Sequence, residues 1–211
     1  DILWFMPIHP IGKIGRKGSI GSPYAISDYR AVNPDFGTLE DFIRLTKEIH
    51  RRGMKCIIDV VYNHTSPDSV LSKEHPEWFY RDRNGKPKAK VAEWWDIVDL
   101  DYKNPGLWDY LVKTLCYWAQ YVDGFRCDVA SFIPLEFWKM ARAAVEEVRP
   151  GAFWLAESVE TGFIQRIRGN GEYCLSDSEL YQAFDACYDY DIFNELSRYL
   201  LGKGPLGRYL D

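Results

Sequence analysis

The sequence predicts a parallel α/β fold of the barrel type. Three apolar runs of strand length occur at residues 56–61, 124–130 and 153–157, and each carries polar groups at or near its C-terminal end. Segments with helical patterning separate the strand-like runs, which is the alternation expected of a parallel sheet. Parallel α/β barrels place their functional groups at the C-terminal ends of their strands. We therefore expect the functional site where these runs end.

The start of the chain contains one complete strand–helix–strand unit. Residues 2–8 form an apolar run that predicts a buried strand. The stretch Thr38-Leu-Glu-Asp41 is similar to a capping box, so we expect a helix to begin there. An apolar stripe follows, and the basic residues before Gly53 predict the end of this helix. Residues 55–61 then form the second strand.

Two loops lie between the first strand and this helix. The loop at residues 12–23 is rich in glycine and basic residues. No helix starts directly after it, which argues against a role in cradling phosphate. A polar and aromatic loop, residues 23–29, follows it.

A long polar segment, residues 65–99, interrupts the alternation. It is too long for an ordinary connection between elements, so we interpret it as a small inserted subdomain within one domain of residues 1–211. Four of its aromatic side chains have two open interpretations, as the core of the insertion or as platforms for sugar rings: Trp78, Phe79, Trp94 and Trp95.

The alternation resumes after the insertion. Pro105 is well placed as the first residue of a helix that reaches about residue 122. Helices are expected at residues 134–148, 161–167 and 191–201, and a further strand within the apolar and aromatic stretch 181–188.

Composition excludes several classes of function. The net charge of −5 argues against nucleic acids and anionic membrane surfaces as partners. No apolar run reaches 18 residues, so no membrane-spanning segment is expected. The five cysteines have neither metal-type spacing nor a disulfide pattern, which favours reduced thiols and a cytoplasmic location.

One charged pair stands out within the strand-like runs. Arg126 and Asp128 are two residues apart, so on a strand their side chains project from the same face. Opposite charges there can hold each other ionised. For an isolated pair of this kind, a structural ion pair in the sheet core is the better interpretation. Asp59 and Glu157, on neighbouring runs, shift the interpretation towards catalysis.

Together these stretches resemble the α-amylase family, glycoside hydrolase family 13. The motifs that carry the resemblance are SPYAISDY (22–29), DVVYNH (59–64), GFRCDVA (124–130) and FWLAES (153–158), in the family's order. The resemblance implies a (β/α)8 TIM-type barrel that is incomplete here, containing about strands 2 to 6, with a small insertion after the third strand. A closed barrel cannot be completed from about five strands, because an open sheet leaves unpaired edges.

The resemblance implies a catalytic pair, with Asp128 as the nucleophile and Glu157 as the general acid and base. Retaining glycosidases need one ionised and one protonated carboxyl, about 5–5.5 Å apart. We expect Arg126 to lower the pKa of Asp128, whereas Glu157 has no adjacent cation in the sequence and stays protonated more easily.

Five further residues are implied to bind or support the substrate site: Tyr24, Asp59, Asn63, His64 and Arg126. By resemblance, Tyr24 stacks beneath the reactive sugar, Asn63 and His64 lie near it, and Asp59 supports Arg126. His64 alone would be better interpreted as a structural histidine, and only its motif favours substrate contact.

Besides the missing barrel strands, two departures from the family pattern affect these expectations. The third catalytic carboxylate, in a His-Asp pair on a later strand, has no counterpart before Asp211. Ser131 and Phe132 stand where many α-amylases have a substrate-binding lysine and a calcium-binding histidine. Asn63 alone is weak evidence for calcium, so no metal ligand and no cofactor are predicted.

The resulting hypothesis is a retaining glycoside hydrolase that acts on α-glucosidic linkages of starch-like glucans or maltooligosaccharides. One alternative keeps the mechanism but transfers the glycosyl unit to another sugar, as in trehalose-synthase-like relatives. Another is a non-catalytic barrel used as a binding subunit, although such proteins usually lack the catalytic carboxylates. We expect the 211-residue chain by itself to be inactive, and the sequence leaves the oligomeric state open.

Overall fold

The main sheet has five strands in the order β1-β2-β5-β6-β7, and every neighbouring pair is parallel. The computed structural model describes residues 1–91, 93–205 and 207. The strands are β1 (Ile2–Phe5), β2 (Lys55–Val60), β5 (Gly124–Cys127), β6 (Phe153–Ala156) and β7 (Ala186–Cys187). Spatial order follows chain order, as in the wall of a (β/α)8 barrel, so the predicted fold class is confirmed.

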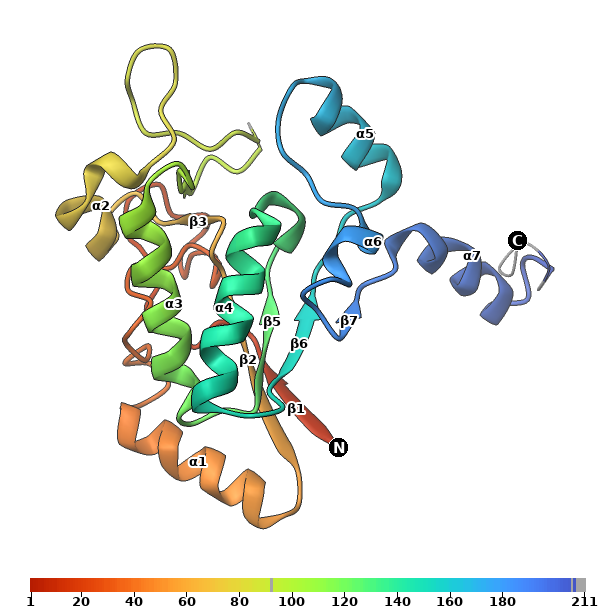
Figure 1. The fold of residues 1–211 in the computed structure, drawn as a ribbon, viewed down its shortest axis with the longest axis horizontal. Coiled ribbons are helices and arrows are strands. Elements are labelled where there is room, and N and C mark those ends of the chain that lie inside the picture. Colours follow the sequence, from red (N-terminus) through yellow and green to blue (C-terminus); the bar gives the residue numbers. More distant parts are fainter. Residues whose placement is uncertain (92, 206, 208–211) are drawn as a thin grey trace.

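Helices follow the strands. They are α1 (Leu39–Arg51), α3 (Pro105–Ala119), α4 (Leu135–Val148), α5 (Thr161–Gly169), α6 (Asp177–Leu180) and α7 (Tyr190–Leu200). All of these except α6 were predicted from the sequence. Helices α3 and α4 lie side by side along the sheet (Figure 1). The ring of Trp138 on α4 packs against Trp154 on β6, with 6.4 Å between centroids. The capping box of α1 is confirmed: the Thr38 and Asp41 side chains each accept the other's backbone N–H.

Several element boundaries differ from the sequence expectation. Strand β1 ends at Phe5 rather than at residue 8, two residues before Pro7, which has no N–H to donate to a ladder. Strand β5 ends at Cys127, because Val129 takes a left-handed conformation with φ 37° and a short 3-10 helix, η2 (Ala130–Phe132), follows. Strand β7 fills only two residues of the expected stretch 181–188.

Strand β5 needs a glycine at its first position. A Cβ atom on Gly124 would lie 2.0 Å from the backbone oxygen of Phe153 on the neighbouring strand. Only a residue without a side chain allows this close approach. Gly124 therefore allows β5 to approach its register partner Phe153 on β6 closely at the start of both strands.

The segment between β2 and α3 carries four short elements: β3 (His64–Thr65), α2 (Val70–Glu74), η1 (Pro76–Trp78) and β4 (Val98–Asp99). Strands β3 and β4 pair antiparallel and so tie the two ends of the segment together. In Figure 1 the segment stands beyond the C-terminal ends of the main strands. We propose that residues 65–99 form an inserted subdomain.

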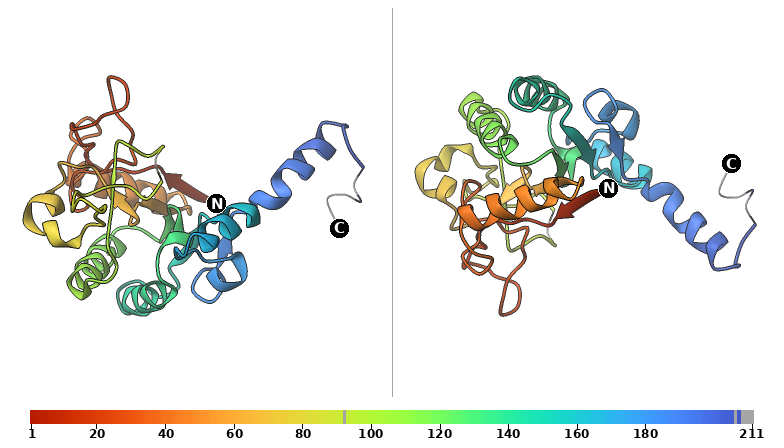
Figure 2. Two further views of the ribbon diagram at one scale, coloured as in Figure 1. Left: turned by 90° about the horizontal axis from the view of Figure 1, so that it is seen from above. Right: turned by 90° about the horizontal axis from the view of Figure 1, so that it is seen from below.

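The sheet is open in the described part of the chain. Strand β1 is an edge strand, and its apolar residues Ile2, Leu3 and Trp4 are 44%, 40% and 43% exposed. Helix α7 projects away from the body (Figure 2). Both features are expected of a barrel wall that is not closed. Among the described residues, no helix has the length and apolar character needed to cross a membrane.

Candidate active site

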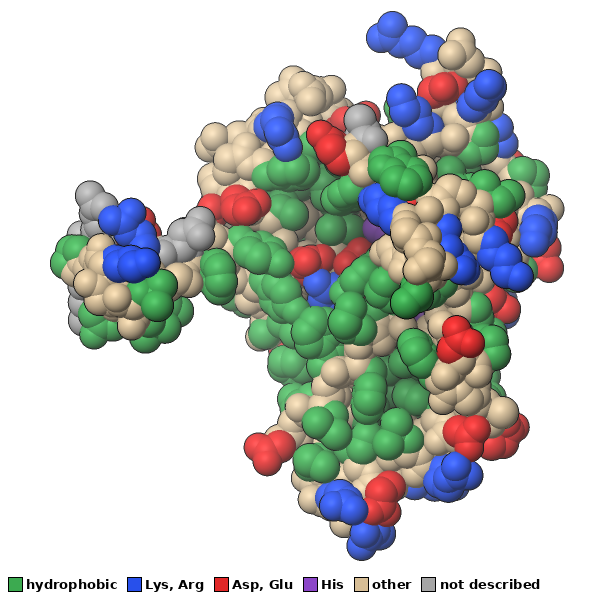
Figure 3. Space-filling view, turned by 180° about the vertical axis from the view of Figure 1, so that it is seen from behind, with side chains coloured by type: hydrophobic (Ala, Val, Ile, Leu, Met, Phe, Trp, Pro, Cys, Tyr) green, Lys and Arg blue, Asp and Glu red, His purple; other side chains and the backbone are tan. Residues whose placement is uncertain are grey.

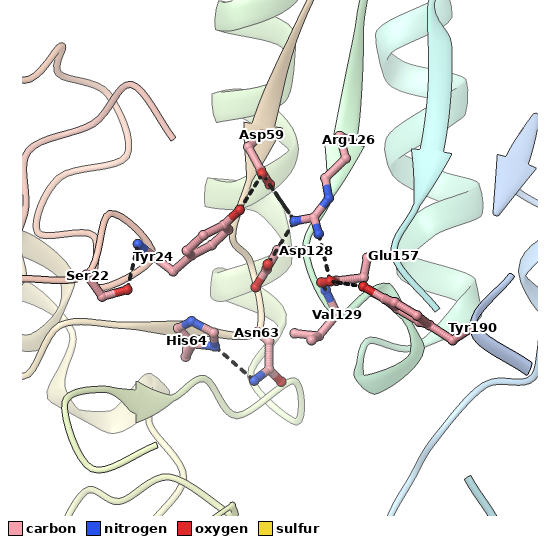
Figure 4. Close-up of polar contacts among 10 residues, drawn as sticks. All are labelled: Ser22, Tyr24, Asp59, Asn63, His64, Arg126, Asp128, Val129, Glu157 and Tyr190. Carbon is pink, nitrogen blue, oxygen red and sulfur yellow. Dashed lines mark hydrogen bonds and ion pairs between the residues drawn. The ribbon is translucent and has the colours of Figure 1, made fainter. Parts of the chain in front are cut away.

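A single buried cation lies at the centre of the site. Arg126 on β5 is 3% exposed, and its guanidinium binds three carboxyl groups (Figure 4). Nη1 lies 3.0 Å from Asp59 Oδ1 and 2.8 Å from Asp128 Oδ1, and Nη2 lies 2.8 Å from Glu157 Oε1. The polar ends of three strands therefore meet at one side chain.

Strand register explains this convergence. Asp59 on β2 is the register partner of Arg126 on β5, so their side chains share one face of the sheet. Cys127 pairs with Ala156 in the next row. Asp128 and Glu157 each follow that row directly, at equivalent positions on neighbouring strands. The expected convergence of Arg126, Asp128 and Glu157 is thus observed.

The carboxyls cannot all be ionised easily around one cation. Burial raises the pKa of Asp128 and of Glu157, and it raises the pKa of Asp59 to about 7. After burial, the negative charge of Asp128 is the largest cause that raises the pKa of Glu157, whereas Arg126 is the largest cause that opposes burial and lowers the pKa of Asp128. Within this pair the proton therefore favours Glu157 and the negative charge favours Asp128.

One electrostatic expectation from the sequence needs correction. Arg126 does favour the charged form of Asp128, but burial outweighs it and the net pKa shift is upward. Glu157 has no adjacent cation in the sequence but contacts Arg126 on the adjacent strand. Its pKa is nevertheless raised, in the direction that was expected.

Glu157 is fixed by two further donors. The backbone N–H of Val129 donates to Glu157 Oε2 at 2.9 Å, and the Tyr190 hydroxyl donates to Oε1 at 3.2 Å. Val129 is a β-branched residue at φ 37°, a conformation that costs on the order of 1–3 kcal/mol. The strained backbone turn places its N–H against the carboxylate of the neighbouring strand.

Tyr24 and His64 lie on the opposite side of the site from Tyr190. The Tyr24 hydroxyl donates to Asp59 Oδ2 at 3.2 Å, and its ring centroid is 5.9 Å from the Arg126 guanidinium carbon. His64 is buried, and burial lowers its pKa, so the imidazole is neutral at pH 7. The Asn63 side-chain amide donates from Nδ2 to His64 Nδ1, 3.2 Å away.

A cavity of about 350 Å³ opens onto these groups. Its described lining consists of Lys17, Ser22, Tyr24, His64, Trp94, Asp96, Ile97, Arg126, Asp128, Val129 and Glu157. Figure 3 shows acidic and basic side chains side by side in a hollow, surrounded by hydrophobic ones. Asn63 and Asp59 are not among these lining residues, but they contact His64 and Arg126, respectively.

The four aromatic residues of the insertion separate into two groups. Trp78 and Phe79 are 8% and 3% exposed and belong to the hydrophobic core. Trp94 lines the cavity, and Trp95 beside it is 60% exposed. The core interpretation therefore applies to Trp78 and Phe79, whereas a role as a sugar platform stays a prediction for Trp94 and Trp95.

Sequence reasoning did not assign Lys17, Asp96 and Tyr190 to the site. Lys17 and Asp96 belong to segments that had been noted, and Tyr190 lies between the expected strand stretch 181–188 and the expected helix 191–201. Tyr190 follows directly after strand β7 and its flanking turn, which is a signal that could have been used. Nothing in the sequence indicates the contact between Lys17 and Asp96.

The residues near Asn63 do not fit a calcium ion. Asn63 directs its amide nitrogen, not its oxygen, at Asp99, 3.4 Å away, and Asp99 Oδ2 accepts the backbone N–H of Lys90. Phe132 nearby offers no lone pair. Calcium requires six to eight oxygen ligands. Across residues 1–91, 93–205 and 207, no group of three acidic, histidine or cysteine side chains is placed to hold a metal.

Comparison with known proteins gives matches at three levels. The family model described as "Alpha amylase, catalytic domain" matches residues 1–161. The alpha-1,4-glucan:maltose-1-phosphate maltosyltransferase of Myxococcus xanthus is 34% identical over 181 residues, covering 75% of this chain and 27% of the relative. The protein of the same name from Rhodospirillum rubrum is 36% identical over 181 residues, covering 75% and 26%.

Two solved structures match the whole chain. An alpha-amylase from Lactobacillus plantarum is 56% identical with a TM-score of 0.96, covering 100% of this chain and 50% of that one. A maltogenic alpha-amylase from Thermotoga neapolitana is 42% identical with a TM-score of 0.85, covering 100% and 46%. The chain thus spans about half the length of these two proteins (50% and 46%) and about a quarter of the curated relatives (27% and 26%).

Proposed function

Because the chain belongs to the alpha-amylase family, we propose that it is part of an enzyme that cleaves α-glucosidic linkages of starch-like glucans or maltooligosaccharides with retention of configuration. The observation that carries this proposal is the binding of Asp59, Asp128 and Glu157 by one buried arginine. A non-catalytic binding subunit would not need two carboxyl groups, those of Asp128 and Glu157, held against one arginine at the ends of neighbouring strands.

In the proposed first step, Asp128 attacks the anomeric carbon as the glycosidic C–O bond breaks. Glu157 donates its proton to the departing oxygen, and a covalent glycosyl-enzyme forms. In the second step Glu157 removes a proton from water, whose oxygen displaces Asp128 from the anomeric carbon. The charges around the two carboxyls support this division, because the negative charge of Asp128 raises the pKa of Glu157 and Arg126 opposes the effect of burial on the pKa of Asp128.

The other residues around the cavity support this chemistry. Arg126 stabilises the charge of Asp128, and Asp59 fixes the Arg126 guanidinium through two contacts of 3.0 and 3.1 Å. We propose that Tyr24 provides a ring face for the reactive sugar and that neutral His64 contacts its hydroxyls. Asn63 would then act through His64, whose Nδ1 it contacts.

The charges of the cavity favour a neutral glucan as the substrate, and so hydrolysis, over maltose 1-phosphate as the donor in a transfer reaction. Among the described lining residues the two cations are Lys17 and Arg126, and each is bound to carboxylate oxygens. A sugar phosphate would need a cation available for its charge. Transfer to another sugar remains the second candidate, because the curated relatives are named as maltosyltransferases.

Incubation of the purified full-length protein with maltotetraose, with and without inorganic phosphate, tests this proposal. Proton NMR follows the anomer released first, and reducing-end assays measure hydrolysis. We expect shorter oligosaccharides with the α-anomer first, no requirement for phosphate, and no turnover by Asp128→Asn. Release of the β-anomer first, or formation of maltose 1-phosphate in place of free sugar, would overturn the proposal.

We also propose that residues 1–211 alone are inactive, because their sheet has open edges at β1 and β7 in the described residues. Reducing-sugar release by the purified 211-residue chain, abolished by Asp128→Asn, would contradict this.

A further inference from the structure

The glycine-rich basic loop, residues 12–23, reaches the cavity through one side chain. Lys17 Nζ lies 2.7 Å from Asp96 Oδ1 and also donates to the backbone oxygen of Glu93 at 3.4 Å. The side chains of Lys17 and Asp96 are 40% and 4% exposed, and both line the cavity. This ion pair therefore joins the loop to the insertion at the wall of the proposed substrate site.

The loop is anchored close to Lys17. Its first residue is packed tightly, since a Cβ atom on Gly12 would lie 2.2 Å from the Cβ of Ser66. Arg16, next to Lys17, folds back and donates from Nε to the Gly12 carbonyl at 2.9 Å. These contacts hold the loop next to the insertion, within reach of the Lys17 side chain.

Trp94 supplies an apolar surface beside the ion pair. Its ring centroid lies 5.9 Å from that of His64 and 6.0 Å from that of Phe132, so the indole is supported by two other rings. It lines the cavity together with Asp96. A flat ring next to a donor and an acceptor is the combination that recognises a sugar, whose ring has an apolar face and hydroxyls at its edge.

We infer that Lys17 and Asp96 bind hydroxyl groups of a second glucose unit, adjacent to the one that reacts with Asp128, while Trp94 packs against that unit. Lys17 donates, Asp96 accepts, and the pair has no net charge, so it selects neutral sugars over sugar phosphates. This inference rests on the proposed function, since it assigns part of the same cavity.

Binding to an inactive variant tests this inference without turnover. We would titrate the full-length Asp128→Asn protein with maltotetraose by calorimetry, alone and combined with Lys17→Met or with Lys13→Met. Lys13 is an exposed lysine of the same loop and is not among the described residues of the cavity lining. Lys17→Met should weaken binding about tenfold, as expected for loss of a charge-assisted hydrogen bond, and Lys13→Met should leave it unchanged.

A second measurement separates sugar binding from a purely structural role. In Asp96→Asn the Lys17 ammonium loses its counter-charge, so maltose 1-phosphate should gain affinity relative to maltose by about tenfold. A structural role alone would weaken both ligands equally. Maltotetraose affinity unchanged by Lys17→Met, or an unchanged affinity ratio in Asp96→Asn, would overturn the inference. Absence of glucan cleavage by the wild type, with Lys17-dependent binding intact, would instead refute the proposed function.

Discussion

Replacement of Arg126 by glutamine should reveal how strongly one cation supports the three carboxyls. In the wild type the guanidinium contacts Asp59, Asp128 and Glu157 at 2.8–3.0 Å from within the protein interior. Glutamine can donate hydrogen bonds but carries no charge. The remaining carboxyls then lose the interaction that opposes the effect of burial on their pKa values.

The expected cost depends on pH. Removing one partner of a buried ion pair costs about 3–5 kcal/mol where the other partner stays charged. Without Arg126 the pKa values of the carboxyls rise further, so the folded variant holds protons that the unfolded chain has already released. Stability then falls as pH rises. The stability deficit relative to wild type should therefore be large at pH 8 and smaller at pH 5.

Urea unfolding of the full-length protein, followed by tryptophan fluorescence at both pH values, measures this deficit. Arg44→Gln is the matched control, since Arg44 pairs with Asp41 at 2.7 Å on the surface with a side chain that is 79% exposed, and an exposed pair contributes little to stability. The acidic limb of the pH–activity profile should also move to higher pH in Arg126→Gln. An equal deficit at pH 5 and pH 8, with an unmoved acidic limb, would refute this reasoning.

Three further predictions concern the same site. Glu157→Gln should lose most activity on natural glucans but retain more on aryl α-glucosides, since a good leaving group needs little protonation. Similar losses of kcat/KM on both substrates would contradict the role of Glu157 as the acid. The pKa of Asp59 is raised to about 7, so the wild type should lose stability as the pH rises from about 4 to about 7. Asp59→Asn should lose a few kcal/mol less over that range, because it has no proton to release. Parallel stability curves of the two proteins would argue against a buried, protonated Asp59. Chelation with EDTA should leave the melting temperature unchanged, because the amide nitrogen of Asn63 faces Asp99; a calcium-dependent rise would show that the site binds this ion.

The sequence predicted the alternating elements and the position of the site because both depend on local patterns. The Thr38 capping box, the apolar runs and the polar residues at their ends are all visible in short stretches. Arg126 and Asp128 share a strand face because they are two residues apart. Once β5 and β6 pair in parallel, Glu157 lies beside Asp128, because each residue directly follows the last paired row of its strand.

The electrostatics of the site depend on contacts between distant segments. Arg126 contacts Glu157 only because β5 and β6 are neighbours in register. Lys17 meets Asp96 because a loop and an insertion fold over the same strand ends. Val129 adopts a left-handed conformation that no propensity favours for a β-branched residue, so the early end of β5 could not be predicted.

The central claim, that Asp128 becomes covalently attached to the sugar, can be tested by trapping the intermediate. Fluoride is a good leaving group, so full-length Glu157→Gln should still react with an α-glucosyl fluoride, whereas the second step lacks its base. We expect intact-protein mass spectrometry to show one added glucosyl unit, located by peptide mapping on Asp128 and absent from Asp128→Asn. Fluoride release without any adduct, or an adduct on another residue, would contradict the proposed mechanism.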